Sequence, residues 1–277
     1  MKKAIKNILM SVGFAILSAS CSSDLDLTPI SSIGDTNYWK TADQYDAFVA
    51  GIQARFRSHN ANFQALGELR SDIFGTEQGN PSTFTGEATQ GIERMWLQTL
   101  DLDNSGVSNF GGFYSNIGQI NLLIDKLNTS TVVIQANKDY YLGIAYGLRA
   151  FYYFHLLRSW GKVVVQTDPI LSINIADLAK PASSEEEVMA LIKTDVEKSL
   201  SSFGSNYTFR NTKSYWSKPA TLMLKAEVSL WNSYRGGNQT DASAALNALK
   251  DIQTNVPSLA LLPNYSSVFS SSNRGNN

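Results

Sequence analysis

A sixteen-residue stretch, LRAFYYFHLLRSWGKV at positions 148–163, decides the fold class of this 277-residue chain. Its apolar residues continue a pattern that starts at Tyr140 and returns every three or four positions, which is the spacing of one face of an α-helix. Gly161 comes where a glycine ends a helix, because glycine adopts the backbone conformation of a helix C-terminus without strain. The pattern predicts a long helix over residues 140–159 and a mainly all-α fold.

The same helical period returns on both sides of this stretch. Further helices are expected from Thr41 to His59, from Gly106 to Leu127, over 184–202, from Pro219 to Trp231 and from Asp241 to Gln253. Ser184 and Glu187 have the spacing of a capping box, which favours a helix start at that point. Residues 60–105 are expected to be irregular, 163–165 to be a short extended run, and the Ser- and Asn-rich residues from 266 onward to have no helix or strand.

The segment 148–154 has a weak internal counterpart at 224–230, offset by 76 residues. Each segment follows another predicted helix at a similar distance, and the offset is close to two helix hairpins of 34–40 residues. Such hairpins bury their apolar faces only by stacking on one another. The pattern therefore favours stacked hairpins that resemble tetratricopeptide units.

The first twenty residues have the three parts of a secretory signal peptide. Lys2, Lys3 and Lys6 give a positive start, residues 8–17 form an apolar core, and small residues lead directly into Cys21. An apolar core of this length is too short to span a bilayer as a helix. We therefore expect residues 1–20 to be a signal peptide.

Cys21 is the single cysteine of the chain, so an intramolecular disulfide is excluded. Its position directly after the small-residue site resembles the lipobox of bacterial lipoproteins and predicts lipidation at Cys21. The alternative is ordinary signal-peptidase cleavage that leaves an unused thiol, and Ser18 stands where the usual lipobox has Leu. Residues 21–37 would then be a polar tether that joins the lipid to a helical domain over 38–265.

The composition argues against several classes of function. Outside the leader the chain has 20 basic and 24 acidic residues, a net charge of −4, whereas a nucleic-acid-binding protein needs a basic face. The two histidines, His59 and His155, are far apart, and His155 lies on the apolar face of its helix. No zinc, nucleophile-elbow, dinucleotide or phosphate-loop motif is present. We expect no catalytic residue, no metal site and no cofactor.

Several segments, taken in order, resemble the SusD/RagB-type lipoproteins. They are Cys21 followed by Asp24-Leu25-Asp26-Leu27-Thr28-Pro29, the segment Tyr38-Trp39-Lys40-Thr41-Ala42-Asp43, the stretch 148–163, and the helices at 184–202 and 218–231. The resemblance implies a mostly helical fold with four tetratricopeptide-like hairpins and long loops. It also implies a non-catalytic protein, lipid-anchored at the surface of the outer membrane, that delivers oligosaccharides to a SusC-like TonB-dependent transporter.

The chain departs from this family in two respects. Family members usually have about twice this length, so residues 266–277 look like the truncated end of an N-terminal part. Trp160 also stands where the family more often has Phe, which is a conservative difference.

The resemblance places sugar-binding residues in the loop region before residue 106. In members that bind sugars, a Trp and an Asn of roughly this region contribute to the site, which points to Trp96 and Asn104, with Asp101 beside them and Phe84 at the loop tip as a weaker candidate. An aromatic face supplies apolar area for a sugar ring, and amides or carboxylates supply direction. The alternative is that Trp96 packs the base of its loop.

Two other functions remain open from the sequence. One is peptide capture, as in the RagB branch, and the other is a helical-repeat interaction module whose only partner is the transporter. The uncharged polar residues of the loops do not separate sugar from peptide.

Overall fold

The computed structural model describes residues 38–71, 95, 98, 110–171, 179–210, 212–237 and 239–270. Residues Met1–Lys40 and Thr41–Asn277 form separate compact units, and every helix described below belongs to the second. In the first unit the described residues include Tyr38 and Trp39, whose rings meet edge to face at 4.9 Å. The predicted leader (1–20), the predicted tether (21–37) and residues 271–277 lie outside the described residues.

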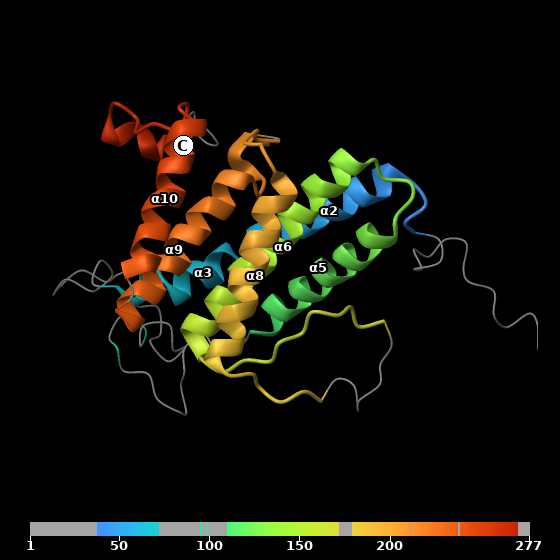
Figure 1. Ribbon diagram of the computed structural model, residues 1–277, viewed down its shortest axis with the longest axis horizontal. Coiled ribbons are helices and arrows are strands. Elements are labelled where there is room, and N and C mark those ends of the chain that lie inside the picture. The colour runs from blue at the N-terminus through green and yellow to red at the C-terminus, as the bar shows by residue number, and fades with distance from the viewer. Residues whose placement is uncertain are drawn as a thin grey trace, which may run out of the picture. The chain divides into compact units, whose positions relative to one another are not determined.

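The second unit is built from helices (Figure 1). In chain order they are α2 (Ala42–Ser58), α3 (Asn60–Leu66), η1 (Glu68–Arg70), α5 (Gly111–Thr129), α6 (Gln135–Trp160), α8 (Glu185–Phe203), η3 (Thr212–Ser214), α9 (Lys218–Gly236), α10 (Gln239–Asn255) and η4 (Tyr265–Phe269). Within the described residues the β pairing is an isolated antiparallel bridge between Val163 and Ser183. The predicted mainly all-α fold is confirmed.

The predicted helix signals at three positions are confirmed. The backbone N–H of Thr41 donates to the Gln44 side chain at 3.0 Å at the start of α2. At the start of α8, the Glu187 N–H donates to the Ser184 hydroxyl at 3.2 Å, and the Ser184 N–H donates to the Glu187 carboxylate at 2.8 Å. Gly161 ends α6 with a φ of 69°, a left-handed conformation that favours glycine.

The prediction that residues 60–105 are irregular is wrong for α3 and η1. α3 is only seven residues long, too short to show a helical period. Its stability comes from tertiary packing, because Phe63 stacks on Phe113 at 5.0 Å and meets Phe151 edge to face at 5.0 Å. The 3₁₀ turn η4 also extends past residue 266, where no helix was expected, and the Ser267 hydroxyl and N–H both donate to the Asn264 carbonyl.

Consecutive helices from α5 to α10 alternate in direction (Figure 1). Side-chain contacts fix this arrangement: the Ser199 hydroxyl near the end of α8 donates to the Gly143 carbonyl near the start of α6 at 2.6 Å. At the opposite ends, Arg235 of α9 pairs with Glu185 of α8 at 3.1 Å. The helices therefore form an antiparallel stack.

The two segments of the predicted internal repeat lie on α6 and α9, the first helices of two hairpins. Helix α6 contacts α8 more extensively than it contacts α5, and α9 contacts α10 more extensively than it contacts α8. The sequence pattern pairs each segment with the helix before it, but each of the two helices has its more extensive contact with the helix after it. The hairpins α6–α8 and α9–α10 agree with the predicted stacking of helical repeats.

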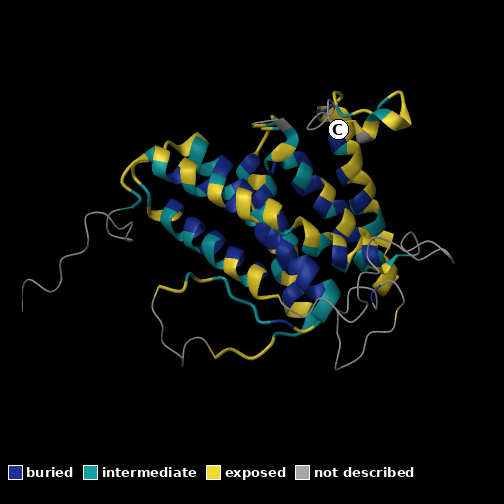
Figure 2. Cartoon of the chain, turned by 180° about the vertical axis from the view of Figure 1, so that it is seen from behind, coloured by how far each residue is buried: buried dark blue, intermediate teal, exposed yellow. Residues whose placement is uncertain are grey.

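Helix α6 is the centre of the fold, and buried residues occupy most of its length (Figure 2). Two glycines one turn apart bring other elements close to its backbone. A Cβ atom at Gly143 would lie 2.9 Å from the ring of Phe203, and one at Gly147 would overlap the indole of Trp216. This close approach is a packing requirement that the sequence analysis did not identify.

A cluster of aromatic side chains fills the space between α2, α3, α5 and α6. Phe56 meets Phe151 edge to face at 5.4 Å and Trp216 at 5.9 Å. Tyr152 lies at 5.4 Å from Phe113, and its hydroxyl accepts a bond from the Asn116 amide at 2.9 Å. Such pairs contribute beyond the apolar area that they bury.

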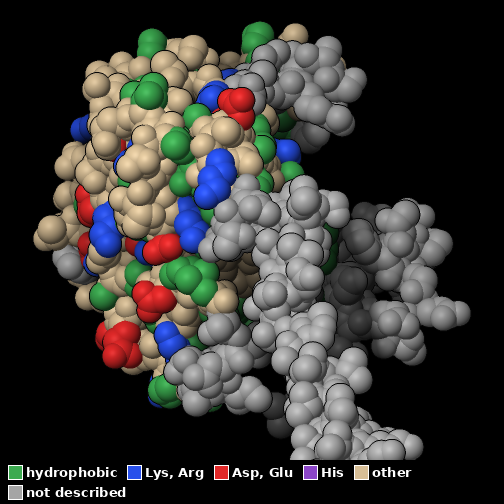
Figure 3. Space-filling view, turned by 90° about the vertical axis from the view of Figure 1, so that its right-hand side faces the viewer, with side chains coloured by type: hydrophobic (Ala, Val, Ile, Leu, Met, Phe, Trp, Pro, Cys, Tyr) green, Lys and Arg blue, Asp and Glu red, His purple; other side chains and the backbone are tan. Residues whose placement is uncertain are grey.

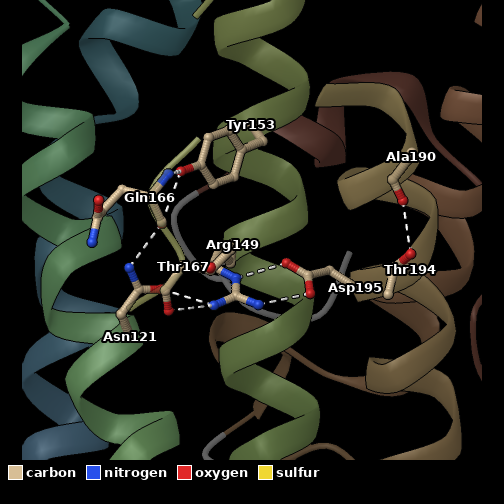
Figure 4. Close-up of polar contacts among 8 residues, drawn as sticks. All are labelled: Asn121, Arg149, Tyr153, Gln166, Thr167, Ala190, Thr194 and Asp195. Carbon is tan, nitrogen blue, oxygen red and sulfur yellow. Dashed lines mark hydrogen bonds and ion pairs between the residues drawn. The ribbon is translucent and has the colours of Figure 1, made fainter. Parts of the chain in front are cut away.

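A buried ion pair joins α6 to α8 (Figure 4). Arg149 donates to both carboxylate oxygens of Asp195, at 2.7 and 2.8 Å, and the two side chains are 5% and 0% exposed. The guanidinium also donates to the Asn121 side chain on α5 at 2.8 Å and to the Thr167 carbonyl at 3.4 Å. A single side chain therefore connects three helices and the segment after α6.

The same network fixes the segment that follows α6 (Figure 4). The Tyr153 hydroxyl donates to the Gln166 carbonyl at 2.9 Å and accepts from the Gln166 N–H at 2.8 Å. Asn121 donates to the same carbonyl at 2.9 Å, and Tyr114 donates to the Val164 carbonyl at 2.7 Å. Side chains thus supply the hydrogen-bond partners of the Val164 carbonyl and of the Gln166 N–H and carbonyl. The chain can therefore cross the helices here without pairing in a sheet.

We predict that Asp195→Ala strongly destabilises the protein, because it leaves the Arg149 guanidinium buried without an opposite charge. Loss of one partner of a buried pair costs about 3–5 kcal/mol in the free energy of unfolding. Urea unfolding at pH 7 measures the loss. The control is Lys225→Ala, which removes the ion pair between Lys225 and Glu197. These two side chains are 30% and 63% exposed, so the loss should cost about 1 kcal/mol or less in the free energy of unfolding. Equal, small losses in the two variants would contradict the role given to Arg149.

Two glycine-to-alanine substitutions should have opposite effects. Gly147→Ala places a methyl group against Trp216, and overpacking of this kind costs about 1–3 kcal/mol. Gly51→Ala in α2 meets nothing within 4 Å and should stabilise by about 0.5–1 kcal/mol, because alanine is the better helix former. Thermal unfolding of both variants tests the pair, and a stable Gly147→Ala protein would show that α6 does not need the close approach.

Candidate functional site

The predicted sugar-binding residues Trp96, Asp101, Asn104 and Phe84 lie outside the described residues, and so does Cys21. The chain one residue before Trp96 is described: Met95 is 3% exposed and packs in a small cluster with Ala65 and Leu69. The structure therefore fixes the chain at Met95, against α3 and η1.

The two histidines belong to the aromatic cluster. His59 Nδ1 is 2.8 Å from the Tyr152 hydroxyl, and burial followed by the charge of Arg55 lowers the pKa of His59. His155 lies 4.7 Å from Phe63 and 4.4 Å from Phe151. Burial, with a smaller contribution from the positive charge of Arg158, lowers the pKa of His155 to about 3. The expectation that His155 packs in the core is confirmed.

Trp160 also has a packing role at the end of α6. Its ring meets Phe110 edge to face at 5.4 Å and Phe113 at 6.4 Å. These contacts agree with a structural role at the end of its helix.

A hollow of about 550 Å³ lies beside Trp231, and we name it the Trp231 hollow. It lies where the end of α6, the start of α8 and the end of α9 meet the start of α10. Its lining residues are Leu157, Glu185, Glu186, Met189, Ala190, Lys193, Trp231, Asn232, Arg235, Gly236 and Asp241. The volume of the hollow lies in the range of small-molecule sites, and its lining combines an aromatic ring with polar groups, as such sites do.

The hollow continues along α9 as a groove between α8 and α10, which lie side by side with α9 in Figure 1. A second hollow of about 350 Å³ shares Lys193 and Asp241 with the first. A third, of about 370 Å³, shares Lys225 and Ala244 with the second. We name this series the α9 groove, and at 1.5 Å per residue it runs about 26 Å from Arg235 to Lys218.

Trp231 is half-buried, with one side in the core and one in the hollow. Its ring meets Phe154 edge to face at 6.1 Å, and the Arg235 guanidinium lies 5.6 Å from its centre. The helical spacing of residues 219–231 puts Trp231 on the apolar face and predicts a core position, which holds only for the side that packs on Phe154. The buried side-chain nitrogen of the adjacent Asn232 has no hydrogen-bond acceptor, a state that costs about 1–3 kcal/mol.

The charges around the hollow compensate one another. Arg235 pairs with Glu185 at 3.1 Å, and Lys193 approaches Asp241 across the groove at 3.7 Å. The carboxylate of Glu186 has a lowered pKa because its own backbone N–H and the Ser184 hydroxyl bond to it at the start of α8. The lining is therefore polar without a strong excess of either sign.

Elsewhere on the described surface the charges are also mixed. Figure 3 shows basic and acidic side chains interspersed on the face seen from the right of Figure 1. No group of three or more His, Cys, Asp or Glu residues in the described part of the chain could hold a metal ion. None of the described helices has the length and apolar character needed to cross a bilayer.

Comparison with known proteins gives a consistent result. Residues 25–230 match the SusD-like family model, which is described as starch-binding and associating with the outer membrane. A SusD-like protein of Formosa agariphila is 33% identical over 267 residues, an alignment that covers 91% of this chain and 48% of that protein.

Two solved structures are similar at higher identity. NanU of B. fragilis is 46% identical with a TM-score of 0.79, covering 89% of this chain and 48% of that one. A SusD superfamily protein of Bacteroides vulgatus is 41% identical with a TM-score of 0.75, covering 86% and 47%. The chain thus spans about half the length of the relatives that it matches.

The lowered pKa of His155 predicts a loss of stability in acid. The unfolded chain binds a proton at this residue near pH 6.5, whereas the folded chain does so only near pH 3. Between these values the unfolded state binds more protons, so the free energy of unfolding falls as the pH falls, by about 1.4 kcal/mol per pH unit. Urea unfolding at pH 7, 6 and 5 measures how the free energy of unfolding changes with pH. We expect the decrease per pH unit to be larger in the wild type than in His155→Leu, by about 1.4 kcal/mol. Equal slopes would contradict the buried, neutral state of His155.

Proposed function

The chain belongs to the SusD-like family of starch-binding proteins that associate with the outer membrane, and from this premise we propose that it captures oligosaccharides at the cell surface and releases them uncleaved. The observation that carries the proposal is the family match over residues 25–230, which includes every helix from α2 to α8 and most of α9. The antiparallel helical stack is the scaffold on which this family's loops are placed. The protein's role is therefore binding, without a chemical step.

We further propose that the ligand contacts include Trp96, Asn104 and Asp101, with Phe84 as a weaker member. An indole face and neighbouring amide and carboxylate groups are the combination that a sugar ring needs. Met95 supports this proposal, because its burial beside Ala65 and Leu69 attaches the chain next to Trp96 to a folded part of the molecule.

The proposed partner is a SusC-like TonB-dependent transporter, which would receive the oligosaccharide. The proposed anchor is a lipid on Cys21, followed by the tether over residues 21–37. Each buried methylene group of a lipid contributes about 0.8 kcal/mol to membrane attachment, and two or more chains give a stable anchor. A protein attached in this way stays at the membrane and moves over a transporter mouth.

We predict that Trp96→Ala abolishes oligosaccharide binding without loss of stability. Truncation of a central aromatic contact typically costs about 2 kcal/mol or more, equivalent to at least about a thirty-fold rise in Kd. Calorimetric titration with maltoheptaose and with laminarihexaose measures the binding, and thermal unfolding of the same samples measures the stability. The matched control is Tyr265→Ala, which removes an aromatic ring that is 81% exposed and should change neither quantity.

The other outcomes of this experiment name the alternatives. If Trp96→Ala unfolds at a much lower temperature, Trp96 is a packing residue of its loop. If the wild type binds neither sugar but takes up components of a tryptic peptide mixture, the peptide-capturing function replaces the proposed one. If it binds neither sugar nor peptide but retains a purified SusC-like transporter, the protein is an interaction module.

A further inference from the structure

We propose that the Trp231 hollow, with the α9 groove that continues it, is a second binding site for a neutral oligosaccharide, formed by other residues than Trp96, Asn104, Asp101 and Phe84. This inference rests on the proposed function, since it assumes that the ligand is a sugar. It adds a site on the helical hairpins, formed by the ends of α6 and α9 and the starts of α8 and α10.

The shape of the site favours a chain-like ligand. The hollow of about 550 Å³ has the size of a small-molecule site. The two smaller hollows continue it in one direction, because neighbouring hollows share lining residues. Helix α9 lines both of them. A ligand that extends from Trp231 along α9 toward Lys218 meets the pair of Lys193 and Asp241, which crosses the groove and offers the hydroxyl groups of the ligand a donor and an acceptor.

Small side chains keep the groove open. Ala190 on α8 and Gly236 on α9 line the hollow, and Ala244 on α10 lines both of the following ones. Ala190 is exposed and lines the hollow, so a larger side chain at this position of α8 would enter the hollow without replacing a core residue. This makes Ala190 the position at which the site can be closed without disturbing the core.

The charges favour a neutral ligand. The basic groups of the hollow, Arg235 and Lys193, are paired with Glu185 and Asp241. The side chains of Arg235 and Glu185 are 52% and 40% exposed, so their pair is weak and remains available to hydrogen-bond a ligand. A phosphate or a polyanion would need an uncompensated positive charge, which this arrangement does not offer. Hydroxyl groups, in contrast, accept from the cations and donate to the carboxylates.

An aromatic side chain gives the hollow its sugar-binding surface. Trp231 presents indole area to the hollow while its other side is held by Phe154. An indole face supplies apolar area for a sugar ring. The unpaired side-chain nitrogen of the neighbouring Asn232 is buried, so we assign it no ligand contact.

The walls of the site are held before any ligand arrives. Asp195 lies on α8 next to the lining residues Lys193 and Val196, and its pair with Arg149 fixes α8 on α6. Thr221 of α9 lies 2.8 Å from Ser199 of α8 through their hydroxyl oxygens, which fixes the floor to the same wall. A site with fixed walls loses little freedom when a ligand binds.

The test follows the indole N–H resonances of the full chain by NMR during titration with maltoheptaose and laminarihexaose. The chain has five tryptophans, and Trp231→Phe identifies the resonance of Trp231 by its disappearance. We expect a saturable shift of that resonance in the wild type. Ala190→Trp fills the hollow and should raise the Kd reported by that resonance by about ten-fold or more. The matched control is Ala136→Trp, an exposed position on α6 about 30 Å from Leu157, which should leave the Kd within about two-fold.

The outcomes separate this site from the proposed function. A Trp231 shift that persists in Trp96→Ala and weakens in Ala190→Trp supports two independent sites. Binding that shifts the Trp96 resonance and leaves Trp231 unchanged overturns the second site and leaves the proposed function intact. If no tryptophan resonance responds to either sugar, both the second site and the proposed function are wrong.

Discussion

The guanidinium of Arg149 is buried in the helical core, and the positions of the neighbouring helices depend on the partners that it requires. A buried charge is tolerated only when an opposite charge and further hydrogen-bond acceptors surround it. Asp195 on α8 supplies the charge, while Asn121 on α5 and the Thr167 carbonyl supply the remaining acceptors. These hydrogen bonds fix α5 and α8 on α6. They also hold the segment that follows α6 where it crosses the helices. Because α9 packs on α8 and α10 on α9, the orientation of the later hairpin depends on the same contact.

This arrangement produces both of the features that matter for binding. Met95, which precedes the proposed ligand residue Trp96 in the chain, packs with Ala65 of α3 and Leu69 of η1. Helix α3 is in turn held by the aromatic cluster through Phe63. Elsewhere, α8, α9 and α10 enclose a groove whose basic groups are paired with acidic ones and whose widest part is bordered by Trp231. We propose both as places where a polar, uncharged ligand binds. His155, whose pKa is lowered by burial, is not among the residues that line the Trp231 hollow.

The sequence predicted the helices well where their signals are local or periodic. Thr41, Ser184, Glu187 and Gly161 gave the correct ends, because capping and left-handed glycine are properties of a few adjacent residues. α3 was missed because its stability comes from Phe63 packing on distant rings. The role of Gly147 was missed because the approach of Trp216 joins positions far apart in the chain. For the same reason Trp231 looked like a core residue: helical spacing shows that a side chain faces inward but does not show where neighbouring helices diverge and leave a hollow. The predicted loop site rests on the family resemblance and stays a prediction.

We propose that this chain binds oligosaccharides and leaves them intact. Equilibrium dialysis of the purified chain against maltoheptaose and laminarihexaose, followed by mass spectrometry of the recovered sugar, tests both parts of this proposal. We expect saturable retention of at least one of the two sugars and recovery of the full-length heptamer or hexamer after prolonged incubation. Absence of retention of both sugars, or recovery of shortened products, would contradict it.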